Sequence, residues 1–402
     1  MSGEYTDMIQ KAEAHTAAGD WRSAAADYAE AAHLAGMSGL AEPAWRSWLA
    51  AGSCWRREDE LHEASRCLRR AMSLVEHGGE AEAATVPHLA AVLLDRGEAE
   101  AAEEMFESSS AGVPTGSMSA IYLDTRIGTL LALGRKEAAR LLLANLQTRT
   151  EPAAVLAAKV RDTQIRGLDG DLGRARNAWR RLVVTLYNDE QARAGVGAAL
   201  AGLAEVELLL GETRSAVERF EEASAAWRDA GRLSAAWRAD ARRVCAMVAL
   251  GVQPLPGLLN PGFEYAEQRG LVPLVALLHL ARGIGLAATS PGLGEEDLAA
   301  ATELSMQIGV PLLVGRTAYE RALRLPGTDR QRLNLLDTAA MALVSHVPLA
   351  ARVALARARL IAQFDPVQAR EVARMCLPRL DAMNMSRDAV AARALLRHLG
   401  AP

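Results

Sequence analysis

Histidine, cysteine and paired carboxylates are the side chains that most often carry catalysis or metal binding, and here their spacing supports neither. No two histidines stand four residues apart, the spacing at which one helix directs two imidazoles at a zinc ion. The four cysteines form no Cys-x-x-Cys pair. Neighbouring carboxylates such as Glu103 and Glu104 point about 100° apart on a helix, as expected of solvated faces. The sequence therefore predicts no catalytic residue, no metal site and no cofactor. The histidines are His15, His33, His62, His77, His88, His279, His346 and His398; the cysteines are Cys54, Cys67, Cys245 and Cys376.

Glycine-rich segments offer phosphate-binding chemistry, but their context argues against it. The segment GIGLAATSPGLG, from Gly283 to Gly294, follows no strand, and a phosphate loop requires one. The chain contains neither a Gly-x-x-x-x-Gly-Lys-[Ser/Thr] motif nor a Gly-x-Ser-x-Gly motif. Small residues at helical spacing from Gly195 to Gly202 suit close helix packing instead. We expect a non-enzymatic protein, with an enzyme using an unrecognised site between helices as the third alternative.

Composition predicts which kinds of partner the protein lacks and which compartment suits it. Acidic residues outnumber basic ones, 49 to 45, and no basic stripe with interleaved aromatic residues is present, so we expect no nucleic-acid partner. The start of the chain, MSGEYTDMIQ, has no signal-peptide pattern. The longest apolar run, from Leu271 to Ala281, is too short to span a bilayer and contains Pro273. Free cysteines in helical stretches suit a reducing cytoplasm, and the abundance of arginine suits a GC-rich genome. We expect a bacterial, cytoplasmic protein with no membrane contact.

The elements that position any site are helical hairpins repeated along the chain. Alanines recur at steps of 36 to 41 residues, a turn precedes each by five residues, and a large apolar residue follows each four residues later. A residue in the left-handed conformation, usually glycine, ends the first helix. The alanine and the large residue share one face of the second helix, where stacked hairpins complete the core. The alanines are Ala24, Ala64, Ala102, Ala139, Ala175 and Ala216.

Beyond Ala223 the alanine pattern fades, but helix ends continue the period. We expect helices to end near Gly231, Gly270, Gly309, Val347 and Asn384, with proline just past several of the ends. A last helix from Ser386 to Leu399 should open on a serine cap and close the stack. Loops are expected at 108–119, 253–262 and 289–296. The second loop divides an array over 1–250 from degenerate repeats and a capping helix over 251–402, within one continuous solenoid.

The first 230 residues resemble the tetratricopeptide repeat. In the second hairpin Trp48, Gly52, Trp55 and Ala64 fall on slots of that family's pattern, and in the third Pro114 stands near the repeat end. The period of 36–41 residues exceeds the family's 34. The later half resembles the long-period sensor repeats of bacterial signalling ATPases and transcription activators. The resemblance implies an all-α, right-handed α-solenoid superhelix of about ten antiparallel helix pairs with a capping helix.

The same resemblance implies a concave groove lined by the first helices. Counting back from the repeat alanines places six polar residues in ligand-facing slots: Arg46, Arg56, Arg57, Asp124, Gln164 and Glu205. The three arginines could hold an acidic peptide or a terminal carboxylate by forked hydrogen bonds. They could equally pair with Glu58, Asp59 and Glu60 nearby.

Two functions follow. The first is a cytosolic protein-interaction scaffold that binds a peptide or protein surface in the groove through shape and a few polar anchors. The alternative is an effector-sensing array of a bacterial signalling system that acts in trans on an ATPase or a transcription regulator. The sequence identifies neither the partner nor the oligomeric state.

Overall fold

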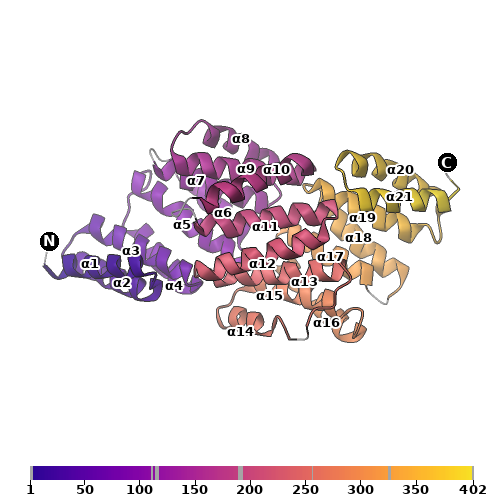
Figure 1. The fold of residues 1–402 in the computed structure, drawn as a ribbon. Coiled ribbons are helices and arrows are strands. Elements are labelled where there is room, and N and C mark those ends of the chain that lie inside the picture. Colours follow the sequence, from indigo (N-terminus) through magenta and orange to yellow (C-terminus); the bar gives the residue numbers. More distant parts are fainter. Residues whose placement is uncertain are drawn as a thin grey trace.

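The computed structural model describes residues 3–109, 112–113, 117–188, 193–255, 257–324 and 327–400. Within these ranges the chain forms 21 α-helices and no strand (Figure 1). None of the described helices is both long enough and apolar enough to cross a membrane. The helices are α1 (Gly3–Ala18), α2 (Trp21–Met37), α3 (Ala41–Arg57), α4 (Leu61–Ser73), α5 (Glu80–Arg96), α6 (Ala99–Ser108), α7 (Ser117–Ala132), α8 (Lys136–Gln147), α9 (Pro152–Asp169), α10 (Leu172–Tyr187), α11 (Arg193–Leu210), α12 (Thr213–Asp229), α13 (Leu233–Ala249), α14 (Asn260–Gln268), α15 (Val272–Leu286), α16 (Pro291–Ile308), α17 (Pro311–Arg324), α18 (Asp329–Ala342), α19 (Val347–Ile361), α20 (Pro366–Ala382) and α21 (Ser386–His398).

In chain order the described helices form ten pairs, and α21 follows the tenth, which confirms the expected all-α solenoid with a closing helix. The two helices of each pair pack on each other except in the seventh, where α13 packs on α15 and the short α14 contacts α15 as well. All six repeat alanines are completely buried. Phe106, Trp179 and Phe220, four residues after three of them, are buried with them. Burial of such aromatic side chains is a large apolar contribution to each hairpin.

The turn inside each early hairpin uses the left-handed backbone conformation that the sequence predicts. Gly97 has φ of 87°, and Gly19, Gly134, Gly170 and Gly211 also have positive φ. In the second hairpin Asp59 adopts φ of 58°. A carboxylate at this one turn is unusual because a side chain disfavours the conformation, so Asp59 requires compensating contacts.

Glycines inside helices allow close packing, as expected for the 195–202 segment. A Cβ on Gly202 would lie 2.5 Å from the Trp179 ring, and a Cβ on Gly197 would lie 2.8 Å from the Trp227 ring. The same reason explains the Gly283–Gly294 segment, where the backbones of α15 and α16 meet directly. A Cβ on Gly294 would lie 3.0 Å from the Ala287 backbone.

Two local expectations were wrong. The segment 289–296 is mostly the first turns of α16, because Pro291 occupies a first-turn position that suits its fixed φ and missing N–H. Ser386 is the first residue of α21 and not its cap; Met385 holds the cap position and makes no side-chain cap bond. The expected helix ends near Gly231, Gly270 and Gly309 agree with α12, α14 and α16.

The solenoid coils so tightly that its second turn rests on its first. Each hairpin turn from the second to the sixth contacts the start of a first helix five hairpins later, at a separation of 175 to 177 residues. We call this row of contacts the seam. Contacts only between neighbouring hairpins were expected, and the seam adds long-range ones. Its pairs are Asp59 with Ser234, Gly97 with Pro273, Gly134 with Pro311, Gly170 with Val347, and Gly211 with Arg387.

Asp59 holds the first contact of the seam. Its buried carboxylate accepts hydrogen bonds from the Ser234 backbone N–H at 3.0 Å, the Ser234 hydroxyl at 2.7 Å and the Tyr265 hydroxyl at 2.7 Å. The acceptor also lies at the start of α13, where the helix dipole favours negative charge. These contacts offset the unfavourable backbone conformation of Asp59.

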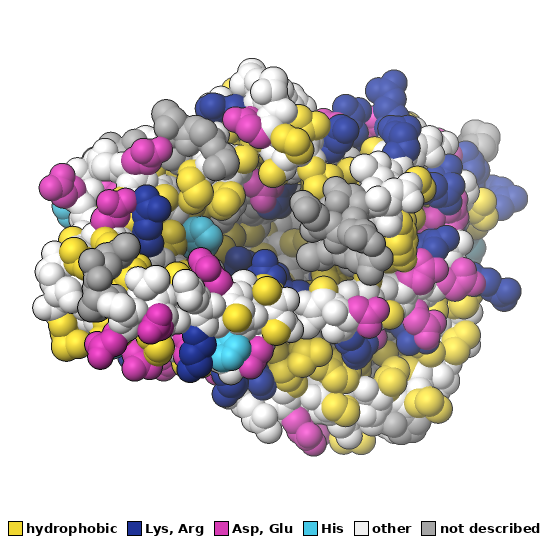
Figure 2. Space-filling view, turned by 60° about the vertical axis from the view of Figure 1, so that its left-hand side comes forward, with side chains coloured by type: hydrophobic (Ala, Val, Ile, Leu, Met, Phe, Trp, Pro, Cys, Tyr) yellow, Lys and Arg dark blue, Asp and Glu magenta, His cyan; other side chains and the backbone are white. Residues whose placement is uncertain are grey.

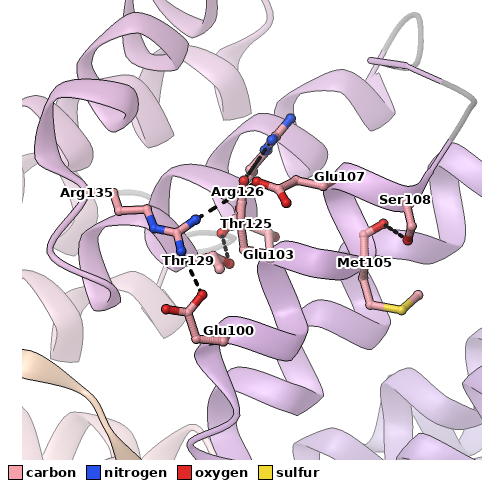
Figure 3. A network of polar contacts seen from close by, with 9 residues as sticks. All are labelled: Glu100, Glu103, Met105, Glu107, Ser108, Thr125, Arg126, Thr129 and Arg135. Carbon is pink, nitrogen blue, oxygen red and sulfur yellow. Dashed lines mark hydrogen bonds and ion pairs between the residues drawn. The ribbon is translucent and has the colours of Figure 1, made fainter.

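Ion pairs connect neighbouring hairpins as well. Arg126 of α7 donates to Glu103 of α6 at 2.7 Å, and Arg135 donates to Glu100 at 2.8 Å (Figure 3). Glu103 is 2% exposed, so its charge depends on this partner.

Candidate functional site

The inner sides of the first helices carry a ladder of ion pairs, each between residues about one hairpin apart. Arg56 of α3 donates to Asp95 of α5 at 2.7 Å, and Arg352 of α19 donates to Asp388 of α21 at 2.9 Å. Between them, Arg161 of α9 forms a forked pair with Asp124 of α7 at 2.7 and 3.0 Å. We call this surface the inner wall, and most of its charges are neutralised within the chain.

A hollow opens on the molecular surface between the arms of the solenoid, with basic, acidic and histidine side chains at its border (Figure 2). Further along the chain, helices from different hairpins approach each other through ion pairs of Glu205. Glu205 of α11 pairs with Arg242 of α13 at 3.3 Å and also with Arg316 of α17 at 2.6 Å. Helix α17 belongs to the ninth hairpin and α11 to the sixth, so in a five-hairpin turn these residues approach from different sides. This three-charge cluster links α11, α13 and α17.

Two histidines beside these charges are kept neutral. Burial, and then the charge of Arg56, lower the pKa of His88 to about 4. His88 Nδ1 lies 3.2 Å from the Ser53 hydroxyl, which can donate to it. Burial and Arg316 lower the pKa of His346 to about 4. Neither imidazole carries charge near neutral pH, so neither offsets a nearby anion or acts as a cation.

Two arginines in this region have no carboxylate partner among the described residues. Arg232 precedes α13 by one residue, next to the Asp59–Ser234 contact, and its buried Nε has no hydrogen-bond partner. Burial, and then the nearby charge of Arg56, lower the pKa of Arg232, whereas the nearby Asp95 and Asp59 carboxylates partly oppose this shift without forming an ion pair with it. Arg238 is half-buried and stands four residues before Arg242, so it faces the same side of α13. Their guanidinium groups stay charged at neutral pH.

The six residues expected in the groove lie in different surroundings. Arg56, Asp124 and Glu205 belong to ion pairs of the inner wall, and Gln164 accepts a hydrogen bond from Arg161 at 3.0 Å. Arg161 thus brings Asp124 and Gln164 together. Arg57 instead stacks over the Trp21 ring at 4.2 Å.

Arg46 lies at another position, beside a recess of about 600 Å³ between the starts of α3 and α5. It pairs with Glu42 at 2.7 Å, one helical turn away. Trp45 lies at the same recess and donates from its ring nitrogen to the Thr85 hydroxyl at 2.8 Å.

Counting back from the repeat alanines did not identify four arginines of this region: Arg161, Arg232, Arg238 and Arg316. One signal was available in the sequence, because Asp124 and Arg161 are opposite charges 37 residues apart, one repeat period. No such signal existed for Arg316, whose partner Glu205 is 111 residues away. Only the curvature of the coil brings that pair together.

No group of three or more His, Cys, Asp or Glu side chains in the described part of the chain is arranged to hold a metal ion. The cysteines that the structure describes are free thiols. Burial raises the pKa of Cys54 and of Cys67 to about 11, so both stay protonated and unreactive near neutral pH.

No protein-family model and no curated protein matches this sequence. A Rap protein complexed with Competence and Sporulation Factor is similar in structure, with a TM-score of 0.48 and 10% identity, over 80% of this chain and 98% of that chain. Yeast Tom70 is similar with a TM-score of 0.33 and 10% identity, over 97% and 95% of the two chains. Cut9-Hcn1 of the APC/C gives a TM-score of 0.35 and 14% identity, over 99% and 90%. The helical-repeat fold itself is shown by the order and packing of the described helices.

Proposed function

We propose that the protein is a non-enzymatic binding scaffold whose inner wall holds a peptide or protein segment that carries carboxylates. The observation that carries this proposal is that Arg232 and Arg238 form no ion pair with a described carboxylate, on a wall where most charges are paired. A partly buried guanidinium that makes no direct ion pair is incompletely compensated in the free protein, even with the Asp95 and Asp59 carboxylates in the neighbourhood of Arg232. A bound carboxylate would remove that penalty and would form charge-assisted hydrogen bonds.

The geometry favours an extended acidic segment over a single small anion. Arg232 lies one residue before α13, and Arg238 lies six residues later, about 1.7 helical turns further along. Arg56 stands near Arg232, but Asp95 already occupies its Nε. The successive arginines therefore suit carboxylates spaced along a chain, with Gln164 and Ser53 as neutral polar contacts.

Binding of labelled peptide pools to the full-length protein tests this proposal. Three degenerate decapeptide pools, rich in Asp and Glu, neutral, and rich in Lys, are titrated by fluorescence anisotropy. We expect the acidic pool to bind best, and Arg232→Gln combined with Arg238→Gln to weaken that binding at least about tenfold, equivalent to about 1.4 kcal/mol.

The matched control changes two exposed arginines without ion pairs on second helices, Arg181→Gln with Arg214→Gln. This variant removes the same charge and should leave binding within about twofold. Equal binding of the acidic and Lys-rich pools, or equal losses in the two variants, would contradict the proposal.

The alternative, an effector-sensing array, has one observation in its favour. Arg232 is two residues from Ser234, which donates two hydrogen bonds to Asp59 at the seam. An anion held by Arg232 would therefore act beside a contact between the two turns of the coil. A change in small-angle X-ray scattering on addition of a metabolite mixture, with no binding of any peptide pool, would favour the sensor.

A further inference from the structure

The two ends of the solenoid carry opposite charge. Residues 1–109 contain 20 acidic and nine basic residues, whereas residues 310–402 contain seven acidic and 14 basic residues. The net charge of the whole chain, −4, conceals this division because the intervening residues contain 22 of each sign. Figure 1 places the two termini at opposite ends of the molecule. Negative charge is therefore concentrated at the N-terminal end of the molecule and positive charge at the C-terminal end.

Much of this charge is exposed and unpaired within the chain. At the N-terminal end, exposed carboxylates without ion pairs include Glu4, Asp7 and Glu13 of α1 and Glu30 of α2. At the C-terminal end, exposed arginines without ion pairs include Arg359 of α19, Arg374 and Arg379 of α20, and Arg397 of α21. In Figure 2 Lys and Arg side chains gather toward the far, right-hand edge, and Asp and Glu side chains predominate toward the near, left-hand edge.

The end helices also keep apolar surface that no neighbouring hairpin covers. Within α1 only Ala12 is buried, and Tyr5, Met8 and Ile9 are partly exposed. On α21 Val390 is 59% exposed. A solenoid end normally presents a polar cap to water, because a hairpin without a neighbour leaves one face uncovered. Here each end combines some apolar surface with charge of one sign.

We propose that these ends bind each other, so that the acidic end of one copy, formed by α1 and α2, docks on the basic end of a second copy, formed by α20 and α21. A second copy is the occupant that charge complementarity selects, because every molecule carries both surfaces. The contact is head-to-tail, and repetition of it produces an open chain or a closed ring of copies. Opposed charges accelerate the encounter and fix its direction, and salt weakens it.

The direct test is the mass of the full-length protein in solution, measured by sedimentation equilibrium at 5 to about 100 μM protein and at about 20 and 500 mM NaCl. We expect the weight-average mass at low salt to rise with concentration above the monomer mass of 42.9 kDa and to return to it at high salt. A mass of 42.9 kDa at every concentration in low salt would overturn the proposal.

Two charge-reversal variants test the direction of the contact. One carries Glu4→Lys, Asp7→Lys and Glu13→Lys, which changes the net charge of residues 3–37, the α1–α2 surface, from −4 to +2. The other carries Arg374→Glu, Arg379→Glu and Arg397→Glu, which changes the net charge of residues 366–398, the α20–α21 surface, from +3 to −3. Each alone should associate at least tenfold more weakly than the wild type. Their mixture should regain association with equal amounts of the two variants in the complexes.

A control separates the ends from net charge in general. Arg181→Glu with Arg214→Glu reverses two exposed arginines in the middle of the chain and should associate within about threefold of the wild type. Failure of the mixture to associate, or an equal loss in this control, would overturn the head-to-tail contact. Circular dichroism checks that all variants keep their helix content. The outcome is independent of peptide binding at the inner wall, because none of these residues lies there.

Discussion

Removal of the Asp59 carboxylate should loosen the contact between the two turns of the coil. Asp59→Ala deletes three hydrogen bonds and leaves the Ser234 N–H, the Ser234 hydroxyl and the Tyr265 hydroxyl without their acceptor. Each buried donor left unsatisfied costs about 1–3 kcal/mol, and partial access of water to Tyr265 reduces its share. We therefore expect a loss of about 3–5 kcal/mol. Tyr265→Phe removes one bond and one donor together, so its loss should be about 1 kcal/mol.

The assay must resolve local opening, since a repeat solenoid need not unfold in one step. Hydrogen–deuterium exchange of peptides that cover the α3–α4 turn and the start of α13 reports on this contact. A loss of about 3 kcal/mol corresponds to roughly a 100-fold faster exchange there. Peptides from α7 and α8 lie away from this contact and should exchange as in the wild type. Asp59→Asn serves as the matched control, because asparagine tolerates the left-handed backbone and keeps one acceptor oxygen.

A double-mutant cycle decides whether the energy belongs to the seam. Asp59→Ala and Ser234→Ala share one of the three hydrogen bonds, the one donated by the Ser234 hydroxyl, because alanine keeps the backbone N–H; their effects should therefore be coupled by about 0.5–1.5 kcal/mol. Coupling below about 0.5 kcal/mol, with unchanged exchange at α13, would refute the reasoning. It would mean that the second turn of the coil stays in place through other contacts.

Three further predictions concern single positions. The pKa of His88 is about 4 in the folded protein and 6.5 for an ordinary histidine, so the unfolded chain binds the proton first as the pH falls. Up to about 3 kcal/mol of stability that is present above pH 6.5 is therefore lost as the pH falls to about 4. In urea unfolding followed across this pH range, His88→Gln should reduce the dependence of stability on pH. Gly202→Ala should lower the thermal midpoint through overpacking that costs about 1–3 kcal/mol, whereas Gly173→Ala, with open space at its Cβ, should raise stability by up to about 1 kcal/mol. Glu103→Ala leaves a part-buried arginine unpaired and should cost about 2–4 kcal/mol, whereas exposed Glu104→Ala should change stability by less than about 0.5 kcal/mol, both measured by urea unfolding.

Local patterns in the sequence predicted the elements of the fold well. The repeat alanines and the left-handed turns follow from helix geometry and glycine conformation, which act over a few residues. The two errors at Pro291 and Ser386 are also local, because proline and serine are accepted both just before and just inside a helix start. The site was less predictable, since slot counting finds which side of a helix a residue occupies but not which partner it meets. Arg56 and Asp124 were placed on the inner side, yet their pairing with Asp95 and Arg161 depends on the neighbouring hairpin.

The sequence by itself determined that this protein is an all-helical array of about ten hairpins. The spacing of buried residues and the residues that form the turns act over a few positions, and the pattern recurs in each repeat. Tertiary structure alone decided how tightly the array coils. A small rotation between successive hairpins accumulates over five of them, and only that sum brings Asp59 to Ser234 and Glu205 to Arg316. The seam, the Glu205 cluster and the position of Arg232 beside Asp59 all follow from this accumulated curvature, which no single repeat encodes.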